Sequence, residues 1–191
     1  MIEKLYSPYA IIVYLVAILR IAELFLSKRN AAILKAKGAF EIRGKHFTTM
    51  KLVHTFWLVS CLVEYLFRDQ IYSSFNFSFF GTIVIMGMTL RYTAISTLGE
   101  RWTVTIWIIP GVPAVNRGIY KFIRHPNYLG VILEMFALPL MVQSWITAVT
   151  FSVLNSLVLK VRIPSEEEEL KKHSQYGSLF HEQSRFIPKV L

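Results

Sequence analysis

Residues 8–26 read PYAIIVYLVAILRIAELFL, an apolar stretch in which Arg20 and Glu23 carry the only charges. Four further apolar blocks follow, at residues 52–67, 77–98, 128–143 and 145–159. A membrane-spanning helix needs roughly 20 apolar residues to cross about 30 Å of hydrocarbon. Because backbone polar groups cannot remain unpaired in lipid, each block is expected to be a helix. The blocks therefore predict an all-α, polytopic membrane protein with about five transmembrane helices.

The composition supports one such domain over residues 1–191. Of the 191 residues, 54% are hydrophobic, and no internal repeat, low-complexity tract or soluble linker divides the chain. The single cysteine, Cys61, lies inside the second block and cannot form an intramolecular disulfide. The sequence leaves the oligomeric state open.

The net charge of +9 is concentrated in alternate connections between the blocks. Residues 27–51 carry seven lysines and arginines against Glu41, and residues 99–127 carry four against Glu100. Residues 143–146 carry no charge. The positive-inside rule then places the basic loops and the C-terminus in the cytoplasm and the N-terminus outside. The charge is thus an orientation signal and a contact for anionic membrane lipid, and no nucleic-acid binding is expected.

Two of the cytoplasmic segments have features beyond those of simple connectors. Residues 31–40, AAILKAKGAF, predict a short interfacial helix that ends at Gly38. Residues 103–109 are apolar but too short to span a membrane, and Pro110 and Pro113 follow them. We expect this backbone to lie at the interface or to line a cavity.

Charged residues inside the apolar blocks are costly and are therefore candidates for function. Arg20 and Glu23 are three residues apart and are expected to pair on one helix face. Glu64 and Arg91 are expected to extend their side chains to the nearest headgroup region. Glu134 has no basic residue four positions away, and its role is left open.

Several classes of site are not supported by the sequence. No motif of a soluble nucleotide-binding fold or of a serine hydrolase occurs. His46 and His54 are eight residues apart with no third ligand nearby, so polar packing is favoured and no metal site is expected.

Residues 165–170, SEEEEL, follow the last apolar block. Ser165 with Glu168 three residues later has the pattern of a capping box, and acidic residues suit the first turn of a helix. Helix initiation alone explains the acidic run, so a structural and a functional role are about equally supported.

Residues 120–134, YKFIRHPNYLGVILE, gather polar groups at the start of the fourth block. Pro126 suits the first turn of a helix, whose backbone amides would face a bound anion. A helix start anchored in headgroups would explain Arg124 and Tyr128, but it would not require His-Pro-Asn between them.

The chain resembles the isoprenylcysteine carboxyl methyltransferases and related membrane methyltransferases. Residues 124–130, RHPNYLG, match the family's RHPxYxG element, and residues 162–170, RIPSEEEEL, match its R-x-x-x-E-E-x-x-L element. Residues 185–188, RFIP, resemble the family's C-terminal ending. Asn127 stands where the prenylcysteine enzymes often have serine. The resemblance covers residues 112–188 well and the N-terminal half mainly in the layout of the blocks.

The resemblance implies an O-methyltransferase that uses S-adenosylmethionine. The cofactor would bind in a cytoplasm-facing pocket of a catalytic half, residues 99–191, with N-terminal helices in residues 1–98. Matched position by position, the residues that would contact the cofactor are Val112, Pro113, Ala114, Val115, Tyr120, His125, Pro126, Asn127, Tyr128 and Glu166. The first four would act through their backbone, and Arg162 would face the substrate.

These residue types suit methyl transfer from a sulfonium to an oxygen that is already an anion. Such an in-line displacement needs alignment of the reactants and exclusion of water more than acid–base help. Aromatic faces can accept the positive charge of the sulfonium. Glu166 can hold the ammonium or the ribose hydroxyls of the cofactor, and Arg162 can hold an anionic oxygen.

The methyl acceptor is expected to be a lipophilic molecule. Residues 98–103, LGERWT, and Pro110-Gly111 resemble a bacterial branch that methylates alkylpyrone-type lipids, which we favour over a prenylated protein substrate. The expected location is a bacterial cell membrane. The alternative is a small membrane transporter or a non-enzymatic membrane protein. A transporter would need paired charges at mid-membrane and usually repeated helices, and the sequence offers Glu134 without a repeat.

Overall fold

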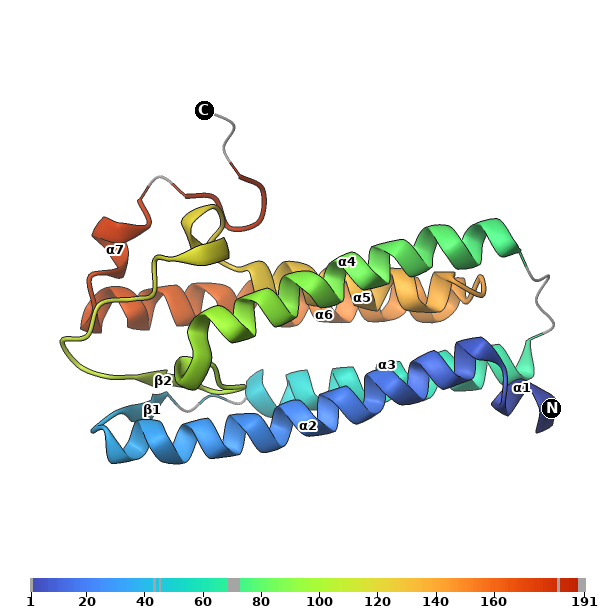
Figure 1. Ribbon diagram of the computed structural model, residues 1–191, viewed down its shortest axis with the longest axis horizontal. Helices are drawn as coiled ribbons and strands as arrows, with labels where there is room; N and C mark the ends of the chain where they lie inside the picture. The colour runs from blue at the N-terminus through green and yellow to red at the C-terminus, as the bar shows by residue number, and fades with distance from the viewer. Residues whose placement is uncertain (1, 43, 45, 69–72, 182, 189–191) are drawn as a thin grey trace.

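The computed structural model describes residues 2–42, 44, 46–68, 73–181 and 183–188, and its long helices lie in two layers (Figure 1). One layer holds α2 (Pro8–Ala36) and α3 (His46–Phe67), and the other holds α4 (Ser74–Leu98), α5 (Pro126–Leu140) and α6 (Trp145–His173). The shorter helices are α1 (Ile2–Leu5), η1 (Gly99–Arg101), η2 (Gly118–Lys121) and α7 (Tyr176–Leu179). Strands β1 (Phe40–Ile42) and β2 (Ile106–Ile108) pair antiparallel, with Glu41 opposite Trp107.

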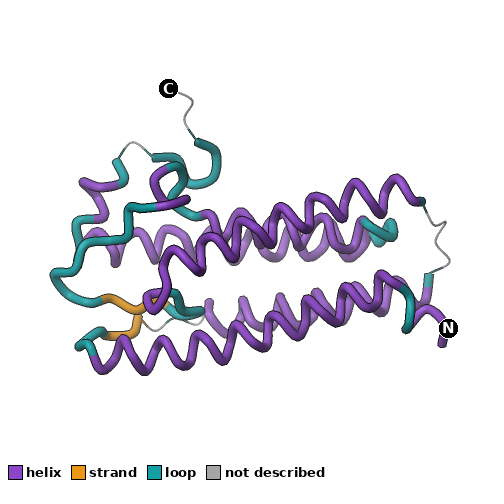
Figure 2. Tube along the Cα trace, in the orientation of Figure 1, coloured by secondary structure: helices purple, strands orange, loops and turns teal. Residues whose placement is uncertain are grey.

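Most of the irregular structure lies at the end of the bundle opposite the N-terminus (Figure 2). The two strands, α7 and the long loops gather there. The opposite end holds α1, the end of α3 and the start of α4 (Figure 1). This asymmetry leaves one end of the helical bundle for a site built from loops.

The prediction of an all-α, polytopic membrane protein is confirmed. Within the described residues, four helices, α2, α3, α4 and α6, are long and apolar enough to cross a membrane. Helix α5 is apolar but has only 15 residues. At about 1.5 Å per residue it is about 22 Å long, which is less than the roughly 30 Å of a hydrocarbon core. A count of five spans and the orientation of the chain therefore stay predictions.

Helix α2 is longer than the sequence analysis expected. It continues without a break from Pro8 to Ala36, so the prediction of a separate interfacial helix at residues 31–40 is wrong. The reason is that no glycine or proline interrupts the chain between the apolar block and Gly38. Gly38 has a φ of +79° and follows the end of the helix, as predicted.

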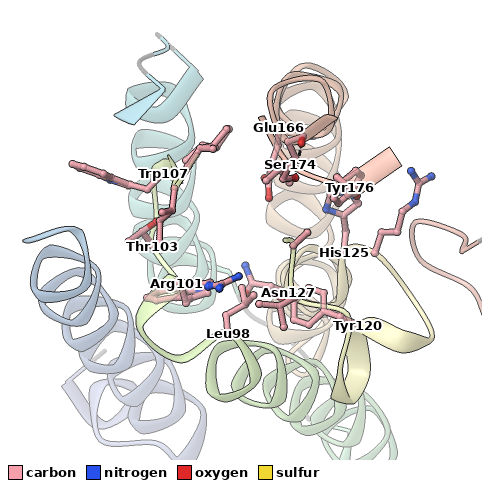
Figure 3. Close-up of a pocket in the computed structure, with 18 of the residues that line it drawn as sticks. Leu98, Arg101, Thr103, Trp107, Tyr120, His125, Asn127, Glu166, Ser174 and Tyr176 are labelled. Carbon is pink, nitrogen blue, oxygen red and sulfur yellow. Dashed lines mark hydrogen bonds between the residues drawn. The ribbon is translucent and has the colours of Figure 1, made fainter. Parts of the chain in front are cut away.

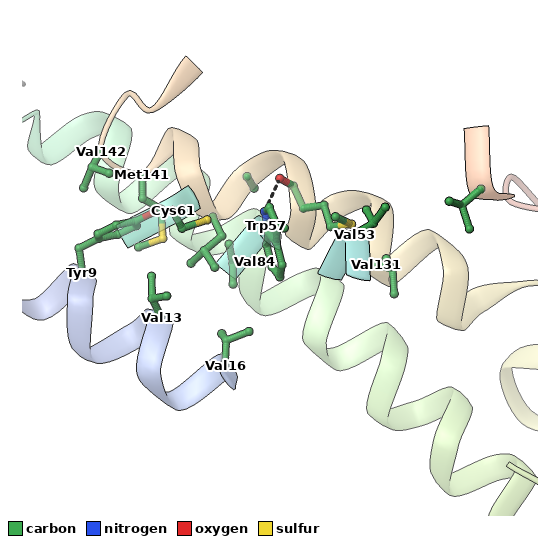
Figure 4. Packing of buried hydrophobic residues seen from close by; sticks show 14 residues of the cluster. Tyr9, Val13, Val16, Val53, Trp57, Cys61, Val84, Val131, Met141 and Val142 are labelled. Carbon is green, nitrogen blue, oxygen red and sulfur yellow. Dashed lines mark hydrogen bonds between the residues drawn. The ribbon is translucent and has the colours of Figure 1, made fainter. Parts of the chain in front are cut away.

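The hydrophobic core lies between the two layers (Figure 4). Tyr9 and Val13 of α2 meet Trp57 of α3 and Met135 of α5 in this cluster. The indole Nε1 of Trp57 donates a hydrogen bond to the Met135 carbonyl at 3.2 Å. That carbonyl cannot receive its usual helical hydrogen bond, because the residue four positions later is Pro139. Trp57 therefore satisfies the backbone group that Pro139 leaves unpaired.

Helices α4 and α5 pack so closely that both need a glycine at their contact. A Cβ atom on Gly130 would lie 2.5 Å from the Gly87 carbonyl oxygen and 2.5 Å from Cγ of Arg91. A Cβ atom on Gly87 would lie 2.9 Å from the Gly130 carbonyl oxygen. Small residues commonly permit such close approach between helices in membranes. The glycine of the RHPNYLG element therefore has a packing role.

Helix α6 passes through Pro164 and continues to His173. The interpretation of Ser165 as a helix start is therefore wrong, because the helix is already formed there. The Ser165 hydroxyl donates instead to the carbonyl of Val161 at 2.9 Å. Helix initiation no longer explains the four glutamates, and each must be considered by what its side chain contacts.

Candidate functional site

A pocket lies at the loop-rich end of the bundle, between α6, the start of α5 and the loops (Figure 3). Nine of the ten predicted cofactor residues line it, together with Arg162: Val112, Pro113, Ala114, Val115, Tyr120, His125, Asn127, Tyr128 and Glu166. The exception is Pro126, which is buried at the first position of α5. Its fixed φ suits a helix start, so Pro126 positions its neighbours rather than lining the pocket. Leu34 of α2 also lines the pocket, so the N-terminal half contributes to it.

Helix α2 holds the loop that follows α4. The side-chain amide of Asn30, which is 2% exposed, donates to the carbonyls of Gly99 at 3.1 Å and Trp102 at 2.8 Å. Ser27 accepts a hydrogen bond from the Val104 backbone N–H at 2.9 Å. The sequence analysis missed both side chains, because an isolated serine or asparagine in a long helix gives no sign of its distant partner.

The stretch at residues 103–109 lines the pocket, which confirms that part of its prediction. Its last residues form β2, whose pairing with β1 was not predicted. Strands of three residues give too short an alternating pattern to recognise in an apolar sequence.

Arg162 is buried beside the pocket, with 4% of the residue exposed. Its Nε donates to the Tyr128 hydroxyl at 2.6 Å and its Nη2 donates to the Val104 carbonyl at 2.6 Å. Its Nη1 contacts the Met50 sulfur at 2.9 Å. The rings of Phe47 and Tyr128 lie 5.0 and 5.4 Å from its guanidinium carbon. Arg162 is thus fixed by neutral partners from three parts of the chain.

Tyr128 links Glu166 to Arg162 by hydrogen bonds. The Tyr128 hydroxyl donates to the Glu166 carboxylate while it accepts from Arg162. None of the ion pairs among the described residues includes Arg162. The pocket therefore contains an open chain of one cation, one phenol and one carboxylate.

Glu167 is buried and joins the three sequence elements that resemble the family, at residues 124–130, 162–170 and 185–188. It accepts from His125 Nε2 at 2.9 Å, and from Arg185 Nε at 3.0 Å and Nη2 at 2.8 Å. Arg124 Nη1 lies 3.2 Å from the same carboxylate. The sequence analysis gave Glu167 no role of its own. Successive residues of a helix point about 100° apart, so Glu166 can line the pocket while Glu167 faces the cluster behind it.

The C-terminal segment completes this arrangement through its backbone. The carbonyls of Ser184 and Arg185 accept hydrogen bonds from the backbone N–H groups of Arg124 and His125, both at 3.0 Å. The segment is thereby fastened to the residues just before α5. The RFIP ending and the RHPNYLG element are neighbours in space.

Aromatic side chains form part of the pocket lining. Tyr176 and Phe180 have ring centroids 4.7 Å apart, and Tyr120 packs in the same cluster. Burial, with a smaller contribution from the charge of Glu166, raises the pKa of Tyr120 above its usual range. Burial also raises the pKa of Tyr176, with a smaller contribution from Glu167. Both phenols therefore stay neutral and offer uncharged aromatic faces, which attract cations.

A second group of buried charges lies between the long helices α2, α4 and α5. Arg20 pairs with Glu23, as predicted, with its Nη1 at 3.0 and 2.8 Å from the two carboxylate oxygens. Arg20 also donates to Glu134. Arg91 closes the group through Glu23 at 2.5 Å and Glu134 at 3.3 Å. We refer to these four residues as the intramembrane ring.

The two predictions of side chains reaching the headgroups are wrong. Arg91 is 4% exposed, because two carboxylates from α2 and α5 hold it inside the bundle. Glu64 is 8% exposed and accepts from the backbone N–H groups of Ile146 at 3.3 Å and Thr147 at 2.7 Å. It therefore caps the start of α6, where free N–H groups favour a carboxylate.

The structure gives no support to a metal site. Among the described residues there is no group of three histidine, cysteine or acidic side chains that could hold a metal ion. His54 Nδ1 lies 2.8 Å from the Met50 carbonyl oxygen, and the side chain of His46 is outside the described part of the chain.

The fold and the pocket define a polytopic, all-α membrane protein with a buried arginine, carboxylates and aromatic rings at one end. The profile of the isoprenylcysteine carboxyl methyltransferase (ICMT) family matches residues 80–172. Protein-S-isoprenylcysteine O-methyltransferase B of Arabidopsis thaliana is 30% identical over 148 residues, which are 76% of this chain and 73% of the relative. The chain therefore belongs to the ICMT family of membrane methyltransferases.

Two further comparisons give a relative of similar length and a similar fold. The uncharacterized protein YpbQ of Bacillus subtilis is 34% identical over 163 residues, which are 84% of this chain and 96% of the relative. The solved structure of the eukaryotic intramembrane Ras methyltransferase ICMT has a TM-score of 0.63 and 20% identity. The structural match covers 96% of this chain and 68% of the methyltransferase chain, so the two proteins share a fold.

Proposed function

We propose that this protein transfers a methyl group from S-adenosylmethionine to an anionic oxygen of a lipophilic acceptor. The observation that carries the proposal is the open chain Arg162–Tyr128–Glu166 beside the aromatic lining of the pocket. This chain places a cation and a carboxylate on either side of one phenol. Two reactants of unlike polarity could then be held within one small site.

The residues of the pocket fit the proposed cofactor. The side-chain oxygen of Asn127 is buried and has no hydrogen-bond partner among the described residues, so it is an acceptor in need of a donor. Glu166 can accept from an ammonium or from ribose hydroxyls. The neutral rings of Tyr120 and Tyr176 can face a sulfonium. The segment 112–115 can approach the cofactor through its backbone.

The bound cofactor would supply a methyl group on a positively charged sulfur. Arg162 would orient the acceptor by hydrogen bonds to its anionic oxygen. Because such an acceptor carries no proton on the reacting oxygen, the pocket requires no general base. Burial of Arg162 and Tyr128 excludes water from the reacting groups, which strengthens the interaction between opposite charges. We further propose that the pocket faces the cytoplasm, on the side of the basic loops.

The acceptor in our proposal combines an acidic oxygen with an apolar tail. Alkylpyrone-type lipids and isoprenylcysteine both fit this description. Residues 98–103 favour the alkylpyrone type, whereas the names of the plant relatives favour isoprenylcysteine. A single protein preparation can be tested with both acceptors, an alkylpyrone-type lipid and an isoprenylcysteine.

The test is a transfer assay on the purified protein in detergent with methyl-labelled cofactor. The acceptors are an alkylpyrone, an N-acetylated S-farnesylcysteine and a membrane lipid extract. We expect label in an organic-soluble product from at least one acceptor, and a strong reduction with Glu166→Gln. Absence of both cofactor binding and transfer in the folded wild-type protein would refute the proposal.

A transporter is the second candidate, because the intramembrane ring supplies the paired charges that such a protein would need. The sequence shows no repeat to accompany the ring. A transporter without enzymatic activity should not bind S-adenosylmethionine in the pocket, so the same binding measurement separates the two.

A further inference from the structure

The three polar partners of Arg162 differ in strength. The Tyr128 hydroxyl and the Val104 carbonyl are good oxygen acceptors, each at 2.6 Å. The partner of Nη1 is the thioether of Met50, and such a sulfur is a weak acceptor. A buried guanidinium needs strong acceptors to compensate for its lost hydration. Nη1 is therefore the part of Arg162 that is least well satisfied by the protein.

Met50 approaches Arg162 from outside the proposed cofactor pocket. Arg162 and Tyr128 line that pocket, but Met50 and Phe47 do not. Both of these residues belong to α3, in the layer opposite α6. Arg162 thus lies between the pocket and α3, and its guanidinium contacts both.

The methionine side chain suits a place that is occupied only part of the time. It is unbranched, has several rotatable bonds and can adopt alternative packings at low cost. Met50 is partly buried at the edge of the main core. Its withdrawal would expose Nη1 without leaving a strong hydrogen bond broken.

We propose that Met50 occupies, in the free protein, the position on Arg162 that the anionic oxygen of the acceptor takes during reaction. This inference rests on the proposed function, because it assigns the acceptor to Arg162. The exchange replaces a neutral thioether by an anion, and charge-assisted hydrogen bonds are roughly twice as strong as neutral ones. Met50 then sets the affinity for the acceptor, since every acceptor must displace it.

A series of side chains at position 50 tests this role. Leu, Met, Gln and Glu have similar length but increasing strength as acceptors for Nη1. The first measurement is the rise in unfolding temperature that dodecanoate causes in detergent, compared with dodecanol as the uncharged control. We expect the rise to be largest for Met50→Leu, smaller for the wild type, smaller again for Met50→Gln and absent for Met50→Glu.

The second measurement is the KM for the methyl acceptor. Loss of one weak hydrogen bond corresponds to about a two- to tenfold change in affinity. We expect the KM of Met50→Leu to fall by about that factor, and the KM of Met50→Gln to rise above that of the wild type. The dissociation constant of the cofactor should stay within about twofold across these variants.

Met88 provides the matched control, because it is a partly buried methionine of α4 in the same core. Met88→Gln should leave the dodecanoate response at the wild-type value. Equal responses and equal KM values for Met50→Leu, wild type and Met50→Gln would overturn the inference, and this comparison remains valid if Met50→Glu does not fold. A graded dodecanoate response without any methyl transfer would support the role of Met50 and contradict the proposed function.

Discussion

The protein buries arginines and glutamates in two places, and the two groups are built differently. In the intramembrane ring, Arg20 and Arg91 each contact both Glu23 and Glu134, so the four charges cancel within one closed group. At the pocket, Arg162 is separated from its nearest carboxylate by a phenol, and a sulfur fills one of its donor positions. Each charge of the closed group has two opposite charges beside it. The open group has both a cation and a carboxylate available.

This difference separates a structural from a functional role for buried charge. Charges within spans are candidates for function by default, but the intramembrane ring uses its charges to join α2, α4 and α5. The pocket leaves its charges partly unmatched at the end of the bundle where loops can admit a ligand. The pairing of each charge with an opposite charge, rather than burial alone, distinguishes the ring from the proposed site.

Breaking the ring should have the largest effect on stability. Glu134→Met removes one carboxylate and leaves an excess positive charge in the spans, which should lower the free energy of unfolding by about 3–5 kcal/mol. Denaturation of the purified protein in detergent measures this loss. The double variant Arg91→Met/Glu134→Met keeps the charges balanced and should recover most of the stability. A double variant less stable than Glu134→Met would contradict the closed-ring account.

The arginine of the open chain should affect turnover instead of stability. Arg162→Lys keeps the charge but loses the planar fork that now contacts Tyr128, Val104 and Met50. We expect methyl transfer to fall by about a hundredfold, as for a misplaced reactant, with cofactor affinity nearly unchanged. Separate measurement of cofactor affinity and turnover checks this. Normal turnover would show that Arg162 serves only to anchor the end of α6.

The neighbouring acids of α6 should behave differently from each other. Glu167→Gln weakens the hydrogen bonds to His125 and Arg185, so we expect a loss of about 2 kcal/mol in unfolding free energy. Faster proteolysis of the C-terminal segment should accompany it, because Glu167 fastens that segment. Glu166→Gln should leave the segment protected. Equal proteolysis rates in the two variants would remove the distinction between Glu166 and Glu167.

The long helices were largely predictable because the length of an apolar block is a property of contiguous sequence. The apolar blocks lie within the observed helices, except for residues 141–143 at the C-terminal end of the fourth block, and Gly38 follows the end of α2 as expected. The pairing of Arg20 with Glu23 was also predictable, since both lie on one helix.

Contacts between helices were not predictable in the same way. The carboxylates that hold Arg91 and the backbone N–H groups that Glu64 caps lie on other helices, and a single helix does not reveal how it is rotated against its neighbours. The role of Glu167 depended on the helix continuing through Pro164, whereas a proline followed by serine and acidic residues has the pattern of a helix start. The resemblance to the family, in contrast, indicated nine cofactor residues and Arg162, all of which line one pocket.

The most direct test of the account is a titration of S-adenosylmethionine into the wild-type protein, Glu166→Gln and Glu168→Gln. Glu168 is the control, because it is an exposed neighbour on the same helix whose carboxylate lies 2.8 Å from Lys172. The account predicts saturable binding to the wild type, binding weakened at least tenfold by Glu166→Gln, as expected for loss of about 1.4 kcal/mol or more, and binding unchanged by Glu168→Gln. Equal affinities in all three proteins would contradict the placement of the cofactor beside Glu166.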